Sequence, residues 1–470
     1  MKIKYSTLLL LFCLTTFPLL SQISNSQKNS VIFLIDDLRP MLTSYGNSWI
    51  QTPHIDALAK KSVQFNRAYC NVPVCGASRA SILTGIRPAR DRFLSYDSRI
   101  DKEVSDAVIT LPQLLKQHGY KTISNGKVSH HTTDREMDWD EIWNPEKAIS
   151  FRDYIDPKNK LADKNSLPVP PFESPMVDDA VYFDGKIAQK TIRDIEIQSQ
   201  TPEPFFIVAG FRKPHLPFNA PKKYWDLYEP SSVPFPSNDQ FPASAPEVAS
   251  RWYELPFYAG IQKGKSPSLE MKRKLIHGYA ACVSYVDQQV GEVTAAIDRL
   301  GLRDDTVVLL MSDHGFSLSE HNRWAKHALF EIELQIPLLI SIPKIAGGKT
   351  TNSFAELVDI YPTLCDVLQI PKPTQLQGSS LMNALKNPST IHKKYAFSRY
   401  HRGETLISER YSYSEWKNKK GIITGRMLYD LQNDPGETTN LSQNREYSKL
   451  IDSLSNRISA MSSQYKIIKK

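Results

Sequence analysis

The chain of 470 residues is long enough to bury a large core, and we expect one large domain followed by a smaller one. Its five cysteines, four of them beyond residue 22, are too few for a disulfide scaffold, and no CxxC pair indicates a zinc site. The formal net charge of +8 is a modest excess that suits either a polyanionic substrate or ordinary solubility, and no nucleic-acid-binding module accompanies it.

The first 22 residues have the pattern of a secretory signal peptide. Lys2 and Lys4 precede an apolar run from Leu8 to Leu20, which is too short and too poorly flanked to be a membrane-spanning helix. No later segment is apolar for long enough to cross a bilayer. We therefore expect residues 1–22 to be removed and the mature protein to be exported, either periplasmic or secreted, without a membrane span.

Two adjacent carboxylates end the first predicted strand. Residues 31–35 (VIFLI) are typical of a strand buried on both faces of a parallel sheet, and Asp36 and Asp37 follow directly. Carboxylates in this position are costly unless a cation compensates them, and a hard divalent ion with oxygen ligands is the usual solution. By itself the pair is equally compatible with a surface turn or a helix cap.

The stretch from Val74 to Pro88 (VCGASRASILTGIRP) places a cysteine where a helix is expected to begin. The residues after Cys75 can form a helix, so the thiol would lie at a helix N-terminus, where partial positive charge favours an anion such as sulfate or phosphate. A single cysteine before a helix is more often a small buried side chain. This segment therefore needs support from the rest of the chain.

Polar side chains also follow three later predicted strands, at 120–124, 204–210 and 306–312. A lone lysine or histidine in such a loop is normally solvated. A second pair of potential metal ligands at the end of a second buried strand is less readily a coincidence. In chain order the candidates are Lys127 and His130, then His215 between two prolines, then Asp313 and His314, and finally Lys326 in the segment EHNRWAKH.

Apolar strands alternate with helices up to about residue 368, which predicts an α/β fold with a large mixed, mostly parallel sheet sandwiched by helices. Later residues show short antiparallel strands and a final helix, which indicate a smaller C-terminal α+β subdomain. We expect a catalytic domain over 29–370 and this subdomain over 371–470. Helices are expected at 52–61, 111–118, 269–300, 356–368 and 444–462, one helix near 178–199 within long loops, and further strands at 336–342, 395–399, 405–413 and 427–431.

In a parallel sheet the strands present their carboxyl ends at one edge, where ligands bind. The predicted topology therefore brings together six candidates that each follow a predicted strand end, namely Asp36, Asp37, Lys127, His215, Asp313 and His314. The sequence therefore predicts one site at that edge of the sheet.

Several motifs resemble those of the type I sulfatases, within the alkaline phosphatase superfamily, and are closest to the iduronate 2-sulfatase branch. The family signature is Cys, any residue, Pro or Ala, Ser, Arg, and Ala77 takes the third position here. The similar segments are DDLRP at 36–40, TPHIDAL at 52–58, CGASR at 75–79, GKVSH at 126–130, KPHLPF at 213–218, SDHG at 312–315, EHNRWAK at 320–326 and RYSY at 410–413.

This resemblance implies that Cys75 is oxidised to formylglycine, whose hydrated aldehyde supplies the nucleophilic hydroxyl. A serine or thiol attacking sulfur would leave a stable ester, whereas the hydrate carries a second hydroxyl whose deprotonation expels sulfate and restores the aldehyde. The resemblance further implies one Ca²⁺ ion and a set of roles for residues of this chain. The calcium ligands would be Asp36, Asp37, Asp313, His314 and the matured Cys75; Arg79 and Lys127 would hold the hydrate, His130 would be the base, His215 the acid and Lys326 a ligand of the sulfate.

The function implied is that of a sulfatase that hydrolyses sulfate esters on a polysaccharide or oligosaccharide, with a sulfated uronic acid or related sugar as substrate. Its partners would be this glycan and a formylglycine-generating or sulfatase-maturating enzyme. Two alternatives stay open: a phosphodiesterase or phosphonate monoester hydrolase of the same superfamily, and a catalytically dead glycan-binding homologue. Other basic side chains either read neighbouring anions or are solvated, namely Arg39, Arg212, Arg323, His327, Arg399, His401 and Arg402.

Overall fold

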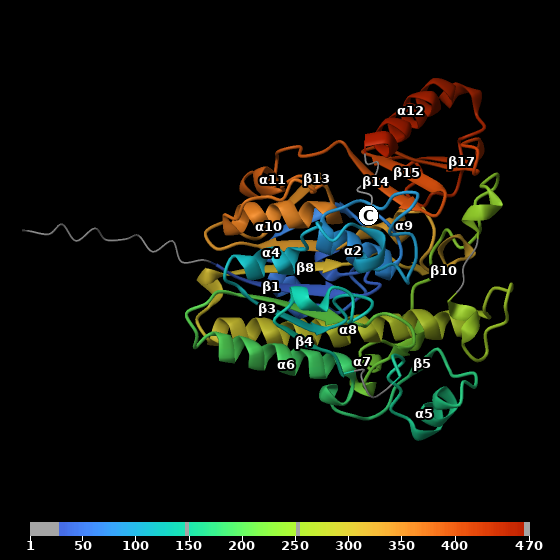
Figure 1. The fold of residues 1–470 in the computed structure, drawn as a ribbon. Coiled ribbons are helices and arrows are strands. Elements are labelled where there is room, and N and C mark those ends of the chain that lie inside the picture. Colours follow the sequence, from blue (N-terminus) through green and yellow to red (C-terminus); the bar gives the residue numbers. More distant parts are fainter. Residues whose placement is uncertain (1–27, 146–149, 251–253, 465–470) are drawn as a thin grey trace, which may run out of the picture.

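A nine-stranded sheet runs through the centre of the molecule in the computed structural model (Figure 1). The model describes residues 28–145, 150–250 and 254–464, so the predicted signal peptide, 1–22, lies outside the described residues. The strand order is β13-β2-β12-β8-β1-β6-β3-β4, and the short β11 also pairs with β2. The strands are β1 (Asn29–Ile35), β2 (Val63–Tyr69), β3 (Lys121–Gly126), β4 (Glu141–Trp143), β6 (Phe205–Phe211), β8 (Thr306–Ser312), β11 (Gln335–Ile336), β12 (Leu338–Ser341) and β13 (Lys349–Glu356).

The sheet is mixed and mostly parallel, as predicted. Strand β1 pairs in parallel with β6 and β8, β3 pairs in parallel with β6 and β4, and β12 is antiparallel to both of its neighbours. The sequence did not predict β2 or β13. Polar residues such as Gln64, Asn66 and Arg67 interrupt the apolar run of β2, because its middle is only partly buried.

Successive residues of β1 enter two different cores, which explains why its apolar run is continuous. Phe33 and Ile35 pack into the core on one face of the sheet, while Ile32 and Leu34 pack into the core on the other. Side chains alternate across a strand, so a strand covered by helices on both faces needs an apolar residue at every position.

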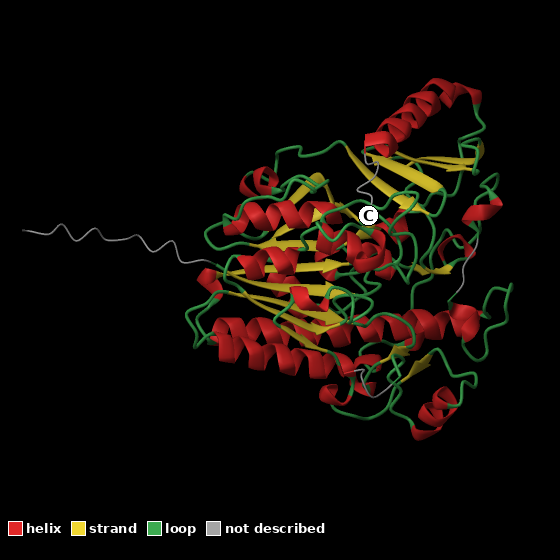
Figure 2. Cartoon of the chain, in the orientation of Figure 1, coloured by secondary structure: helices red, strands yellow, loops and turns green. Residues whose placement is uncertain are grey.

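Helices cover both faces (Figures 1 and 2). On one side lie α1 (Pro53–Ala59), α6 (Phe183–Gln198), α7 (Lys222–Trp225) and α8 (Leu269–Arg299), and on the other lie α2 (Cys75–Thr84), α4 (Leu111–Gln117) and α10 (Ile360–Leu368). No helix in the described ranges is both long and apolar enough to cross a membrane. The remaining elements of this part are α3 (Ile100–Glu103), α5 (Pro157–Lys164), α9 (Glu331–Leu334), α11 (Met382–Lys386), β5 (Phe172–Glu173), β7 (Phe218–Asn219), β9 (Ser317–Leu318) and β10 (Trp324–Ala325).

Two predictions of single elements are wrong. The segment 134–199 contains α5 in addition to the expected helix, because Asp156 caps it by accepting hydrogen bonds from the backbone N–H groups of Lys158 and Asn159. The expected strand at 405–413 is a hairpin of two strands. The Ser408 hydroxyl contacts both the N–H and the carbonyl of Tyr411, which closes the turn between them.

A small antiparallel sheet with one helix follows the large sheet. It contains β14 (Tyr395–Tyr400), β15 (Gly403–Ser408), β16 (Tyr411–Lys417) and β17 (Ile423–Asp430) in sequential order, with α12 (Ser448–Gln464) packed on it. Its own core includes Leu406, Tyr413 and Leu428 from the strands and Leu454 and Ile458 from the helix. The predicted C-terminal α+β subdomain is therefore present in the fold.

Candidate active site

Four adjacent strands of the large sheet end at one edge, and predicted site residues follow directly after these strand ends. In the sheet order β3-β6-β1-β8, Ile35 is paired with Phe211 on one side and Ser312 on the other. Asp36 and Asp313 are thus the next residues of neighbouring strands. Lys127 follows β3, and its N–H donates to the Gly210 carbonyl at 2.8 Å. A side chain at Gly210 would meet the Lys127 backbone at 2.2 Å, so glycine is required for this close approach.

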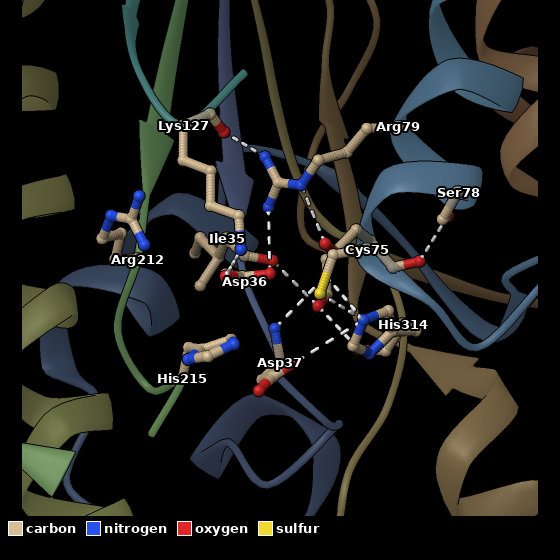
Figure 3. A network of polar contacts seen from close by, with 12 residues as sticks. Ile35, Asp36, Asp37, Cys75, Ser78, Arg79, Lys127, Arg212, His215 and His314 are labelled. Carbon is tan, nitrogen blue, oxygen red and sulfur yellow. Dashed lines mark hydrogen bonds and ion pairs between the residues drawn. The ribbon is translucent and has the colours of Figure 1, made fainter. Parts of the chain in front are cut away.

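Helix α2 begins at Cys75, as predicted, and its first turn packs directly on the end of β8. The Ser78 hydroxyl donates to the Asp313 carbonyl at 2.6 Å. Gly76 leaves room for the loop that precedes α3, because a Cβ there would lie 2.0 Å from the Tyr96 carbonyl oxygen. These two contacts fix the start of α2 above the strand ends, where Figure 3 shows the Cys75 sulfur directed toward the carboxylates.

The structure brings four predicted metal ligands together. One donor atom from each of Asp36, Cys75, Asp313 and His314 lies within 4.8 Å of the others, and all four residues are buried. The Cys75 Sγ lies 3.2 Å from the His314 Nε2, and the Asp37 Oδ1 lies 3.5 Å from the same nitrogen. Four of the five predicted ligands therefore occupy one small volume, whereas Asp37 lies beside them in a second group with His215 and Glu254.

The chemistry of this cluster fits a cation. The His314 Nδ1 donates to the Gly315 carbonyl at 3.0 Å, which leaves the lone pair of Nε2 directed at the carboxylates and the sulfur. Burial raises the pKa of Asp37 well above its usual range, and the neighbouring Asp36 carboxylate adds to this rise although Lys326 opposes it. The Asp36 and Asp313 carboxylates and the inward-facing imidazole lone pair thus converge on one volume, which suits a positive ion. Their oxygen atoms suit a hard ion such as Ca²⁺.

Three buried cations surround the same cluster. The Arg79 Nε donates to the Asp313 Oδ2 at 2.9 Å, and its guanidinium also contacts Asp36 at 3.3 Å. Lys127 pairs with the other Asp36 oxygen, and the Lys326 Nζ contacts both oxygens of Asp37 at 3.0 and 2.9 Å. Burial alone would raise the pKa of Asp36, but Lys127 and Arg79 outweigh it and hold that pKa well below its usual range.

The Cys75 thiol itself is kept protonated. Burial raises its pKa well above the ordinary value, and the Asp36 carboxylate raises it further, against the opposing effect of Lys127. An unmodified cysteine at this position is therefore a weak nucleophile, because the thiolate is the reactive form. The position at the start of α2 does not overcome the effect of burial.

His215 faces the cluster from the loop after β6 (Figure 3). Its Nδ1 donates to the Leu216 carbonyl at 2.5 Å, and its Nε2 lies 3.2 Å from the Glu254 Oε1. The other Glu254 oxygen contacts the Lys326 Nζ at 2.9 Å. Sequence reasoning missed Glu254, since it lies in a long irregular segment far from any strand end and no local pattern marks it.

His130 and Arg212 stand at the margin of the cluster. The ring of His130 contacts the rings of Tyr96 and His131 at centroid distances of 6.0 and 5.0 Å. Burial and the charge of Lys127 lower the pKa of His130 to about 2, so the imidazole is neutral. Figure 3 shows Arg212 beside Lys127 and above His215. Its backbone N–H donates to the buried Asp184 on α6, which fixes the start of the His215 loop.

The four cysteines of the described residues are all buried and free, so none forms a disulfide. Other basic candidates have structural partners. Arg39 pairs with Glu320 at 2.7 Å and Arg323 with Glu333 at 3.0 Å.

Two family models and several known proteins are similar to the chain. A family model described as sulfatase matches residues 28–370, and one described as the C-terminal region of N-sulphoglucosamine sulphohydrolase matches residues 319–464. The chain is 32% identical over 386 residues to the iduronate 2-sulfatase of Mus musculus, covering 73% of this chain and 69% of that protein. It is 29% identical to a sulfatase of Formosa agariphila, covering 97% of this chain and 91% of that protein.

Among solved structures, the phosphonate monoester hydrolase of Silicibacter pomeroyi superposes with a TM-score of 0.79 at 20% identity, covering 94% of this chain and 96% of that one. The fold is thus that of the alkaline-phosphatase-like class. Within it, the chain belongs to the sulfatase family, close to the iduronate 2-sulfatases, and is a sulfuric ester hydrolase.

Proposed function

We propose that this protein is a Ca²⁺- and formylglycine-dependent sulfatase that removes sulfate from a sulfated glycan. The observation that carries the proposal is the buried cluster of Cys75 with Asp36, Asp313 and His314, whose donor atoms lie within 4.8 Å of one another at the edge of the sheet. The fold itself does not need the two carboxylates and the imidazole of this cluster, since these polar groups are costly to bury.

The metal would be held by Asp36, Asp37, Asp313, His314 and the modified residue 75. When bound, Ca²⁺ supplies positive charge that stabilises negative charge on the oxygens of a sulfate ester. The surrounding cations Arg79, Lys127 and Lys326 act in the same direction, because they are buried and already fixed by ion pairs.

Two histidines beside the cluster supply the proposed proton transfers. His130 is neutral because of its lowered pKa, so it can accept a proton from the hydrate of residue 75. Burial lowers the pKa of His215 well below its ordinary value too, so we assign it as the acid that protonates the departing sugar oxygen on its contact with the Glu254 carboxylate, whose negative charge favours the protonated ring. The two rings approach the cluster from different loops, after β3 and β6.

The proposed substrate is a sulfated uronic acid or a related sugar within an oligosaccharide or polysaccharide. The similarity to an iduronate 2-sulfatase supports a sulfated uronic acid. We also propose that residues 1–22 direct export to the periplasm or medium and that a sulfatase-maturating or formylglycine-generating enzyme acts on Cys75. Sequencing the N-terminus of the mature protein from fractionated cells tests the first of these proposals.

The test of the proposed function combines an assay of sulfate release with peptide mass spectrometry. We expect the purified protein to release sulfate from defined 2-O-sulfated uronate oligosaccharides, and peptide mass spectrometry to show an aldehyde in place of the thiol at residue 75. C75A should lower the rate of sulfate release at least about 10³-fold. C365A, which removes a buried thiol far from the site, is the control.

Two results would contradict the proposal. An intact thiol at residue 75 in an active preparation would refute the formylglycine mechanism. Hydrolysis of a phosphonate monoester with no release of sulfate from any sulfate ester would instead favour the alternative reaction.

A further inference from the structure

A cavity of about 500 Å³ lies between the catalytic part of the chain and the C-terminal sheet. One wall consists of the loop 90–94 after α2 and the loop 327–329 after β10, and the other consists of the turn between β14 and β15 and the end of β16. This volume falls in the range of about 300 to 1,000 Å³ that is typical of small-molecule sites. The mechanism proposed above uses none of its lining residues.

The lining is strongly cationic. Arg90, Arg402, Lys417 and Lys419 all line the cavity, and no Asp or Glu is among the described residues that do so. Lys417 pairs with Glu415 at 2.6 Å, but Arg90, Arg402 and Lys419 form no ion pair with any residue that the structure describes. The cavity therefore carries positive charge that the protein itself does not neutralise.

This distinguishes the cavity from the other basic residues of the chain. The arginines that are buried elsewhere each have a carboxylate: Arg323 pairs with Glu333, Arg87 with Glu356 and Arg399 with Glu404. Those pairs are parts of the fold. The unpaired cations of the cavity instead favour the binding of an external anion, because the electrostatic potentials of several like charges sum within a concave surface.

Aromatic rings complete the lining. Tyr400 lies beside both His327 and His401, with ring centroids 5.7 and 4.3 Å apart. Trp416 packs across the backbone of Gly403, where an added Cβ would lie 2.5 Å from the indole nitrogen. Flat apolar faces together with cations suit a sugar ring that carries acidic groups.

The cavity adjoins the catalytic cluster on two sides. Lys326 contacts Asp37 in the cluster, while the next residue, His327, lines the cavity. Leu94 also lines the cavity, and two residues later the Tyr96 carbonyl packs on Gly76, the neighbour of Cys75. Consecutive Cα atoms are about 3.8 Å apart, so a chain of sugars that reaches the cluster can place its next unit in the cavity.

Resting on the proposed sulfatase function, we propose that this cavity is a second subsite, which binds the carboxylate or sulfate of the sugar next to the one that loses its sulfate. Arg402 and Lys419 bind this anionic group, and Tyr400 contacts the ring of the same sugar. The enzyme thereby selects chains in which acidic sugars are neighbours.

The test compares two kinds of substrate on the double variant R402Q/K419Q. We expect the ratio of kcat/KM for a sulfated oligosaccharide with an acidic neighbouring sugar to kcat/KM for a small aryl sulfate to fall about tenfold or more, mainly through KM. Two modified substrates show whether the subsite binds the carboxylate or the sulfate. One is a carboxyl-reduced oligosaccharide and the other is desulfated at the neighbouring sugar. The substrate that lacks the bound anion should be insensitive to the substitutions.

The matched control is K420Q, which removes an exposed charge next to Lys419 that does not line the cavity. It should leave the ratio unchanged. An equal effect of R402Q/K419Q on both substrates, or the same effect with a neutral neighbouring sugar, would overturn the subsite. Wild-type protein with formylglycine at residue 75 that hydrolyses neither substrate would instead overturn the proposed function. Calorimetric binding of the oligosaccharide to C75A, with and without R402Q/K419Q, tests the subsite independently of turnover.

Discussion

Both ring nitrogens of His215 make polar contacts, Nδ1 with the Leu216 carbonyl and Nε2 with the Glu254 carboxylate. Because Nδ1 carries the proton in its bond to the Leu216 carbonyl, Nε2 can donate to Glu254 only when the ring is doubly protonated. Burial lowers the pKa of His215 well below its ordinary value, and Lys326 lowers it further. The Glu254 carboxylate, 3.2 Å from Nε2, favours the protonated ring and so counteracts part of both effects.

E254Q tests this role. Removing the negative charge disfavours the imidazolium, so the pKa of His215 falls further. The decline of kcat with rising pH should therefore move to lower pH, and kcat near neutral pH should fall about tenfold. The measurement is kcat against pH for wild type, E254Q and the control E247Q, which changes an exposed carboxylate in the same segment. A pH profile of E254Q that superposes on that of wild type would contradict the assignment.

At the scale of elements, the last residue of β13 joins the large sheet to the small one. The buried Glu356 accepts hydrogen bonds from both terminal nitrogens of Arg87, at 2.5 and 2.6 Å. It also accepts them from the Lys393 Nζ at 2.5 Å and from the backbone N–H of Phe397 in β14 at 3.0 Å. Burial alone would raise the pKa of Glu356, but Arg87 and Lys393 outweigh it and hold that pKa well below the ordinary 4.5.

We expect E356Q to lower the free energy of unfolding by about 3 to 5 kcal/mol at neutral pH, because it removes the buried carboxylate that Arg87 and Lys393 share, although Lys393 keeps its ion pair with Asp359. A depressed pKa stabilises the folded state above about pH 4.5, and this stabilisation is lost as pH falls toward the native value. The difference between wild type and E356Q should therefore shrink below pH 4.5. Urea unfolding at several pH values measures it.

The control is E409Q, in the exposed turn between β15 and β16, which should change the free energy of unfolding by no more than about 0.5 kcal/mol. A difference between wild type and E356Q that stays constant from pH 7 down to about pH 3 would show that the ion pair does not carry the effect.

At the scale of the whole molecule, two apolar cores on opposite faces of one sheet support a charged cluster at its edge. Asp36, Asp37 and Asp313 are all completely buried there. Helices α2 and α8 pack on opposite faces of the sheet that carries these carboxylates at its edge (Figure 1). Bound cation should therefore contribute to global stability as well as to catalysis.

A chelator is accordingly expected to lower the melting temperature, and added Ca²⁺ to restore it. An ion present at about 100 times its Kd stabilises the folded state by about 2.7 kcal/mol. Differential scanning calorimetry measures this without any substrate. D313N should reduce the Ca²⁺-dependent rise. A melting temperature insensitive to both chelator and Ca²⁺ in the wild-type protein would contradict a calcium site.

The sequence by itself determined the features that depend on neighbours along the chain. The apolar run before Asp36, the run before Asp313 and the helix after Cys75 follow from local periodicity, and parallel topology then places their ends at one edge. The sulfatase motifs identified the family for the same reason, since each is a short contiguous segment.

Tertiary structure alone decided the features that depend on distant partners. Strand β2 is too polar to recognise from its sequence, yet it pairs with β12 and β13. Glu254 contacts His215, which is 39 positions earlier in the chain. Arg402 and Lys419 line one cavity together with Arg90. The physical reason is that local sequence encodes which face of an element is apolar. Which charged groups then meet is set by the packing of those faces, which joins residues far apart in the chain.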